Sequence, residues 1–172
     1  MVKKVDYEIL KTIAKVEIRK YPKLLLATVK GLEDNDAFSL LFDYISGSNQ
    51  KRQRVEMTAP VLTSEKIEMT APVISSESKM SFVMPAKFTI DNLPKPNNPQ
   101  VKIEESPGAK MAMIRFKGYA RPKDVEKFKA ELLSVLARNN IKTEGEPVLM
   151  RYNSPFAPGF MRRNEVGIKI ID

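Results

Sequence analysis

The sequence contains no histidine and no cysteine among its 172 residues. Without histidine, neither histidine-based general acid–base catalysis nor a Ser-His-Asp nucleophile is available. Without cysteine there is no disulfide framework and no thiolate chemistry, and zinc sites built from histidine and cysteine are excluded as well. A metal or a metal-bearing cofactor would therefore need oxygen, thioether or lysine nitrogen ligands.

Long apolar runs are also missing. No run approaches the length of a membrane span, and the segment after Met1 reaches charged residues too early for a signal peptide. Hydrophobic residues still make up 42% of the chain, which is enough to bury a core. We therefore expect residues 1–172 to form a single cytoplasmic domain and a monomer, and the absence of cysteine fits a reducing compartment.

Positive charge is in excess, with a formal net charge of +8. A basic surface attracts nucleic acid, anionic membranes or anionic small molecules. The cations are spread along the chain, and neither a nucleic-acid-binding motif nor a basic helix is visible, so nucleic acid is not the expected partner. The one local cluster that we single out contains Lys51, Arg52 and Arg54.

One short phrase is written twice. Val55–Val61 and Ile67–Val73 share a β-branched residue followed by Glu, Met, Thr, Ala, Pro and Val in the same order. These residues favour an extended chain, and proline donates no hydrogen bond, so each copy belongs at a strand edge, a strand start or a bulge. The phrase predicts a doubled hairpin at a sheet edge.

The pattern of apolar residues predicts strands and helices in the same order in two halves. In the first half, strands at 16–19 and 24–30 precede a helix at 38–45, which is capped by 34–36 and ended by Gly47, and then come the doubled phrase and a strand at 80–84. In the second half, a helix follows Pro122 with Val125, Phe128, Leu132, Val135 and Leu136 on one face, and strands lie at 148–152 and 166–171 around a loop at 153–164.

The two halves also match in spacing. Val16, Ile18, Pro22, Ala27 and Val29 have the same offsets as Val101, Ile103, Pro107, Ala112 and Ile114. We read two β-β-α-β-β repeats, at about 14–90 and 101–172, joined by a proline-rich linker at 91–100. One amphipathic helix cannot cover both faces of a sheet. We therefore predict an α+β fold in which a distorted antiparallel β-barrel carries two outer helices, with a ligand-binding groove where the halves meet.

Several motifs, in this order, resemble those of the SOUL family, also called the haem-binding-protein family. They are Tyr7-Glu8-Ile9-Leu10, Val16-Glu17-Ile18-Arg19 with Tyr21-Pro22, Phe38 to Gly47, the doubled Met-Thr-Ala-Pro-Val, Ser81 to Pro85, Leu93 to Val101, and Arg151-Tyr152 through Arg162 to Val166. The resemblance covers nearly the whole chain and implies the same kind of barrel, a fold similar to the effector-binding domains of gyrase-inhibitor-like proteins.

The resemblance implies non-enzymatic binding of haem or another tetrapyrrole between the first helix and the loop before the last strand. In this sequence, the apolar wall would come from Phe38, Leu41, Phe42, Ile45, Tyr152, Phe156, Phe160 and Met161, and the basic rim for the propionates from Lys51, Arg52, Arg54, Arg162 and Arg163. Arginine suits carboxylates because its guanidinium binds them in a bidentate manner. No structural metal is expected.

Simpler interpretations of the same residues stay open. The apolar stripe of the first helix could be ordinary core, and Arg162 and Arg163 could be solvated or paired with Glu165 or with an acid elsewhere. Glu104 and Glu165 read as exposed charges on strand faces, as do Glu68 and Glu105, so catalysis by carboxylates is not expected.

Iron ligation is the point at which this sequence departs from the family. Some family members have been assigned a histidine ligand to the iron, whereas only methionine or tyrosine is available here, for example Met57, Met69 or Met161. Haem would then be held by shape and by propionate contacts. The alternative is an effector-binding or scaffold module for another small molecule on the same fold.

Overall fold

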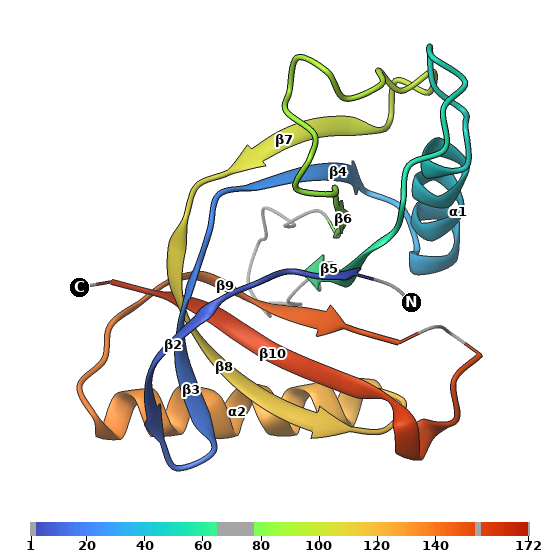
Figure 1. Ribbon diagram of the computed structural model, residues 1–172. Coiled ribbons are helices and arrows are strands. Elements are labelled where there is room, and N and C mark those ends of the chain that lie inside the picture. The colour runs from blue at the N-terminus through green and yellow to red at the C-terminus, as the bar shows by residue number, and fades with distance from the viewer. Residues whose placement is uncertain (1–2, 65–77, 154–155, 172) are drawn as a thin grey trace, which may run out of the picture. The chain divides into compact units, whose positions relative to one another are not determined.

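The computed structural model describes residues 3–64, 78–153 and 156–171. The second copy of the repeated phrase, Ile67–Val73, and with it Glu68 and Met69, lies outside these residues. The chain divides into two compact units (Figure 1). Unit 1 consists of Met1–Lys4 and Leu24–Ser106, and unit 2 consists of Val5–Lys23 and Pro107–Asp172.

Unit 1 is an antiparallel sheet with one helix. Its strands pair in the order β5 (Thr58–Ser64), β6 (Lys79–Val83), β4 (Leu24–Lys30) and β7 (Lys102–Ser106), and β1 (Lys3–Lys4) runs parallel to β5. Helix α1 (Asp34–Ile45) packs on β4 and β6. The first copy of the repeated phrase enters β5, and the pairing register shifts between Thr58 and Val61. Of the three placements that we left open for this copy, a strand edge, a strand start or a bulge, the register shift at Pro60 agrees with the bulge.

Unit 2 has the second sheet and the longer helix. Its strands pair in the order β2 (Glu8–Ile13), β3 (Val16–Tyr21), β8 (Ala109–Lys117), β10 (Arg163–Ile170) and β9 (Thr143–Arg151), all antiparallel. Helix α2 (Pro122–Arg138) packs on β8 and β10, and the short 3₁₀ helix η1 (Gly159–Met161) precedes β10. Pro122 stands in the first turn of α2, as predicted.

Antiparallel strands and two α-helices in the described residues make this an α+β structure, but the closed barrel that we expected is not formed. Within each unit the sheet remains open and does not close on itself. The first strand of each predicted half pairs with the second strand of the other half. Strand β3 of the first half pairs with β8 of the second, and β7 of the second half pairs with β4 of the first. The unit boundaries therefore differ from the predicted repeat boundaries, and the repeat itself stays a prediction.

The buried face of α1 differs from the predicted one. Leu41 and Ile45 are buried together with Ala37 and Tyr44, whereas Phe42 is 48% exposed. Glu33 is the N-cap residue, so Asp34 and Asp36 do not cap the helix. They lie in its first turn, where their negative charges interact favourably with the helix dipole. Burial raises the pKa of Tyr44 to about 12.

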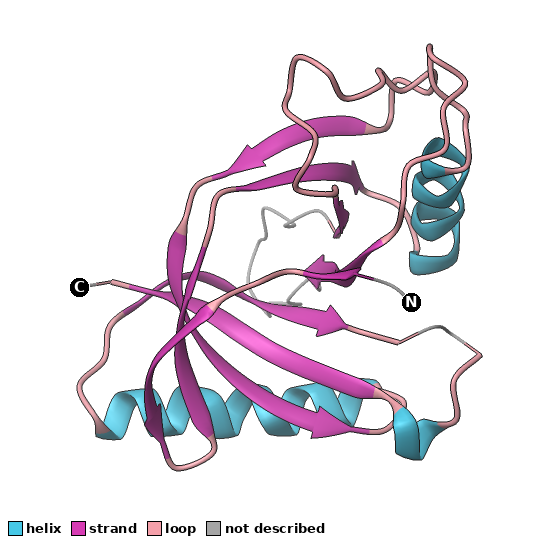
Figure 2. Cartoon of the chain, in the orientation of Figure 1, coloured by secondary structure: helices cyan, strands magenta, loops and turns pink. Residues whose placement is uncertain are grey.

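The segment at 91–100 is packed onto unit 1 and is not a free linker. It belongs to the long loop between β6 and β7 in Figure 2. Leu93 and Pro94 are buried, and the Tyr44 hydroxyl donates a hydrogen bond to the Pro94 carbonyl at 2.6 Å. In the same loop, the Lys95 carbonyl accepts a hydrogen bond from the backbone amide of Gln50.

Candidate functional site

The loop before β10 presents most of the predicted aromatic wall, and it is built on Tyr119. A Cβ atom at Gly159 would overlap the Tyr119 ring, so the ring lies directly on the backbone of η1. The guanidinium of Arg162 lies 4.6 Å from the centroid of the same ring, and its Nε donates to the Ala157 carbonyl at 2.7 Å. Aromatic and cation–π contacts thus fix the shape of this loop.

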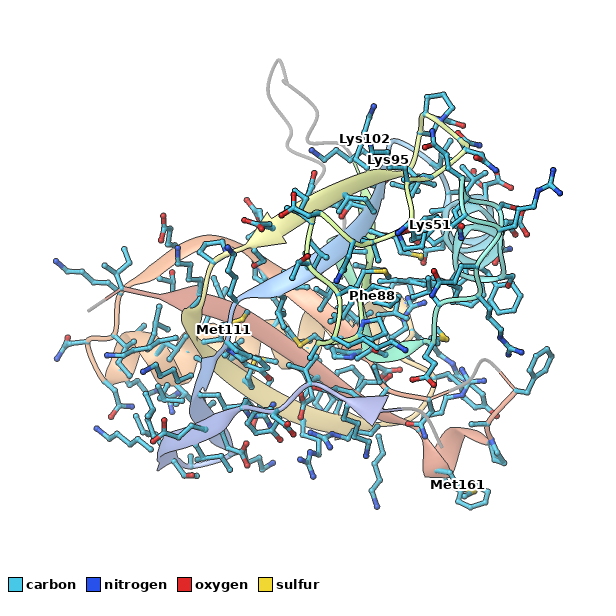
Figure 3. All side chains as sticks on the ribbon, turned by 45° about the horizontal axis from the view of Figure 1, so that its top comes forward. Lys51, Phe88, Lys95, Lys102, Met111 and Met161 are labelled. Atoms are coloured by element: carbon cyan, nitrogen blue, oxygen red, sulfur yellow. The ribbon has the colours of Figure 1, made fainter. Side chains whose placement is uncertain are left out.

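The apolar side chains of this loop point into solvent. Phe156 is 95% exposed, Phe160 77% and Met161 62%. In Figure 3 the side chain of Met161 projects away from the ribbon of its own unit. Side chains of this size are normally buried in a core, so exposed ones on one short loop indicate a surface available for binding.

The predicted residues of α1 divide into core residues and surface residues. Leu41 and Ile45 are buried in the core of unit 1, which agrees with the interpretation of the apolar helix stripe as ordinary core. Phe38 is half-buried, and its ring lies 5.3 Å from that of Phe82 and 6.0 Å from that of Phe42. Phe42 alone of the four keeps a large exposed surface.

The predicted cations of unit 1 lie on the loop after α1. Asn49 organises this loop, because its buried side-chain amide donates to the carbonyls of Tyr44 and Gln53. Lys51 donates to the Asn92 carbonyl at 3.1 Å (Figure 3), and Arg52 and Arg54 are exposed. Helix α1 and this loop belong to unit 1 and Phe156–Arg163 to unit 2, so the slot between them stays a prediction.

Unit 2 contains a buried ionic cluster around Glu165, whereas we had expected Glu165 to be exposed. Arg19 binds both carboxylate oxygens of Glu165 at 2.8 Å, and Glu165 and Arg19 are 0% and 1% exposed. Arg163 donates to Oε1 and the Tyr152 hydroxyl to Oε2, both at 2.8 Å. The predicted alternative that Arg163 pairs with Glu165 is therefore confirmed, and Tyr152 is part of the same cluster.

Aromatic rings enclose this cluster. The Arg19 guanidinium lies 4.1 Å from the ring centroid of Tyr7, and that of Arg163 lies 4.2 Å from the ring centroid of Tyr152. The hydroxyls of Tyr21 and Tyr7 accept hydrogen bonds from Arg19 and Arg163, respectively. Arginine–aromatic stacking of this kind is strongest when it is shielded from water.

The cluster holds Glu165 in its ionised form. Burial alone would raise the pKa of Glu165, but the hydrogen bonds from Arg19 and Arg163 outweigh it and lower the pKa to about 2. The pKa of Tyr152 is raised, first by burial and then by the Glu165 charge. With both oxygens engaged and a pKa far from neutrality, Glu165 is not suited to general acid–base catalysis.

No local pattern in the sequence indicates this cluster, because Glu165 meets Arg19 only through the pairing of β3, β8 and β10. Glu104, which we also expected to be exposed, is half-buried and pairs with Lys30 and Lys79 at 3.4 and 3.1 Å. Ion pairs thus engage the carboxylates of Glu104 and Glu165, whereas Glu105 is exposed, as expected.

The described residues contain no group of three or more metal-binding His, Cys, Asp or Glu side chains. None of the helices in the described part of the chain is long and apolar enough to cross a membrane. What this surface offers a ligand is thus flat apolar contact beside guanidinium groups.

The chain is similar to known proteins in sequence and in fold. The chain is 29% identical to heme-binding protein 1 of Bos taurus over 131 residues, which cover 76% of the chain and 67% of that protein. Heme-binding protein 1 of Xenopus tropicalis is 30% identical with the same coverage. The fold is similar to the C-terminal domain of EcmrR, with a TM-score of 0.65, 10% identity and coverage of 96% and 98%. The family model described as SOUL heme-binding protein matches residues 2–169, and the chain therefore belongs to this family.

Proposed function

We propose that this protein binds haem or a related tetrapyrrole, without histidine ligation and without catalysis. The observation that carries the proposal is the loop before β10. In a member of the SOUL heme-binding family, exposed aromatic side chains stand there beside an arginine stacked on Tyr119. The family description and the names of the relatives refer to binding and to no reaction.

The apolar contacts would come from Phe42, Phe156, Phe160 and Met161. All four are exposed, so a flat ligand could remove their surface from water at about 25 cal/mol per Å² of apolar area. Leu41 and Ile45, which we also placed in the wall, would support Phe38 and Phe42 from the core. The slot formed by these residues is part of the proposal.

The propionates would be bound by exposed or half-buried cations. Arg162 is half-buried at the aromatic surface, and Lys51, Arg52 and Arg54 form the other part of the proposed rim. Arg163 and Tyr152 already bind Glu165, so their role would be to position the loop.

Iron contributes less in this proposal than in a histidine-ligated haem protein. The thioether of Met161 and the phenol of Tyr119 are exposed at the surface and are chemically able to bind iron. Haem would supply a planar ring with two carboxylates, and the chain would hold it mainly by ring contact and charge. We therefore expect exchangeable binding.

The test is a titration with haemin followed by the Soret band. Wild-type protein should shift the band with saturation, and Phe42→Ser and Arg162→Gln should each weaken binding by about tenfold. Leu133→Ser, which changes an exposed leucine on α2, is the matched control and should bind like the wild type. Absence of a shift, together with retrieval of a non-porphyrin ligand from the purified protein, would favour an effector-binding or scaffold module instead.

A further inference from the structure

The apolar tip of unit 2 has a second property, which a small ligand does not require. Phe160 and Met161 are adjacent in η1 and are 77% and 62% exposed, and Phe156, which precedes η1 in the same loop, is 95% exposed. Isolated exposed apolar residues are common, but a protruding group of three is typical of a surface that docks on something larger.

The tip is held rigidly. The Tyr119 ring fills the space beside Gly159, and Arg162 joins this ring to the Ala157 carbonyl. The Met161 amide closes the turn by donating to the Pro158 carbonyl at 2.9 Å. The protein therefore presents these apolar side chains in a fixed arrangement, and docking would not have to order the loop first.

The charged residues around the tip are all positive. The two segments that meet at Tyr119, residues 115–123 and 156–163, contain no aspartate or glutamate. Their cations are Arg115, Lys117, Arg121, Lys123, Arg162 and Arg163. Arg115 and Arg163 contact Glu165, whereas Lys117, Arg121 and Lys123 are exposed, and the Arg121 guanidinium lies 5.9 Å from the Tyr119 ring centroid.

We propose that this tip docks on an anionic lipid bilayer, with Phe160 and Met161 entering the headgroup region and Lys117, Arg121 and Lys123 lying among the lipid phosphates. Aromatic and aliphatic side chains beside cations are the combination that favours a charged membrane interface. Three apolar side chains are too few for the core of a stable protein–protein interface, and this favours lipid over a protein partner. The proposal does not depend on haem binding.

The experiment is co-sedimentation of the whole chain with phosphatidylcholine vesicles, with and without phosphatidylserine. We expect binding only when phosphatidylserine is present, and less of it as salt is raised. Phe160→Ser/Met161→Ser and Arg121→Glu should each lower the partition coefficient by about tenfold or more. Lys142→Glu, a charge reversal outside the two segments, is the matched control and should have at most a small effect.

Gly159→Ala gives an independent test, because it displaces the tip from Tyr119 and leaves every apolar and charged side chain present. It should lower vesicle binding with an unchanged circular dichroism spectrum. The proposal is overturned if wild-type protein does not sediment with phosphatidylserine vesicles, or if the tip variants bind like the wild type. Release of the bound protein by RNA, together with loss of RNA binding in the same tip variants, would assign the surface to nucleic acid and overturn the proposal too.

Parallel haemin titrations separate the two proposals. Phe42→Ser should weaken haem binding and leave vesicle binding intact, and Arg121→Glu should do the reverse. Loss of haem binding in wild-type protein with vesicle binding retained would refute the proposed function alone.

Discussion

Glu165 shows how one buried residue can depend on several strands at once. Its carboxylate is fully removed from water, and Arg19, Arg163 and Tyr152 supply the hydrogen bonds that water would otherwise provide. A buried ion pair of this kind adds little net stability compared with an apolar pair, but removal of one partner leaves the other charge uncompensated.

We predict that Glu165→Gln lowers the free energy of unfolding by about 3 kcal/mol, because Arg19 and Arg163 lose the buried carboxylate that they share and Arg19 keeps only its pair with Glu17. Urea denaturation measures this. The double variant Arg19→Met/Glu165→Met should lose less than the sum of Arg19→Met and Glu165→Met. Simple additivity of the two single variants would show that the pair is not coupled.

The pH dependence of this loss follows from the pKa of Glu165. In the folded protein the pKa is about 2, and in the unfolded chain it is about 4.3. A folded pKa below the unfolded one adds stability above the unfolded pKa, and this is lost as pH falls through the folded pKa. The stability difference between wild type and Glu165→Gln should therefore shrink between about pH 4.3 and pH 2. A constant difference over this range would contradict the assignment.

At the scale of elements, the helices agree with sequence reasoning best. The stripe on α2 is confirmed, because Val125, Leu132 and Leu136 are buried and Phe128 and Val135 pack against them. Helical periodicity is local, so it can be read directly from the sequence. On α1, aromatic Tyr44 enters the core and Phe42 does not, a choice that depends on the Pro94 carbonyl in a distant loop.

Neighbouring leucines on α2 offer a matched test of this packing. Leu132 is fully buried and Leu133 is 38% exposed. Leu132→Ala should cost about 3 kcal/mol through the cavity it leaves, and Leu133→Ala less than about 1 kcal/mol. Thermal and urea unfolding of both variants measure this, and equal losses would show that the helix is rotated from the face described.

For the strands, the sequence predicts burial only in part. Alternation correctly places Val166 and Ile168 in the core, but it also assigned Glu165 to solvent. Strand β10 pairs with β8 and β9 at its two edges, and its consecutive residues 164–168 are all buried, so both of its faces are covered. Alternation in the sequence cannot show this, because it depends on elements that are distant in the chain. The same reason explains why the open sheets and the unit boundaries were not predicted.

At the scale of the whole molecule, the sequence led to the family, and the structure changes the view of its candidate site. The exposed residues Phe42, Phe160 and Met161 stay in the proposed ligand site. Leu41 and Ile45 are core residues, and Arg163 and Tyr152 serve the Glu165 cluster. Burial separates these groups, and burial cannot be read from residue type alone.

The claim that ring contact and charge replace histidine ligation is tested most directly by comparing haemin with iron-free protoporphyrin IX. Both can be titrated into the purified protein under the same conditions, one followed by absorption and the other by fluorescence. We predict that the two dissociation constants agree within about tenfold, since iron ligation adds little in this chain. Binding of haemin about a thousandfold tighter than protoporphyrin, or binding of neither, would contradict this account.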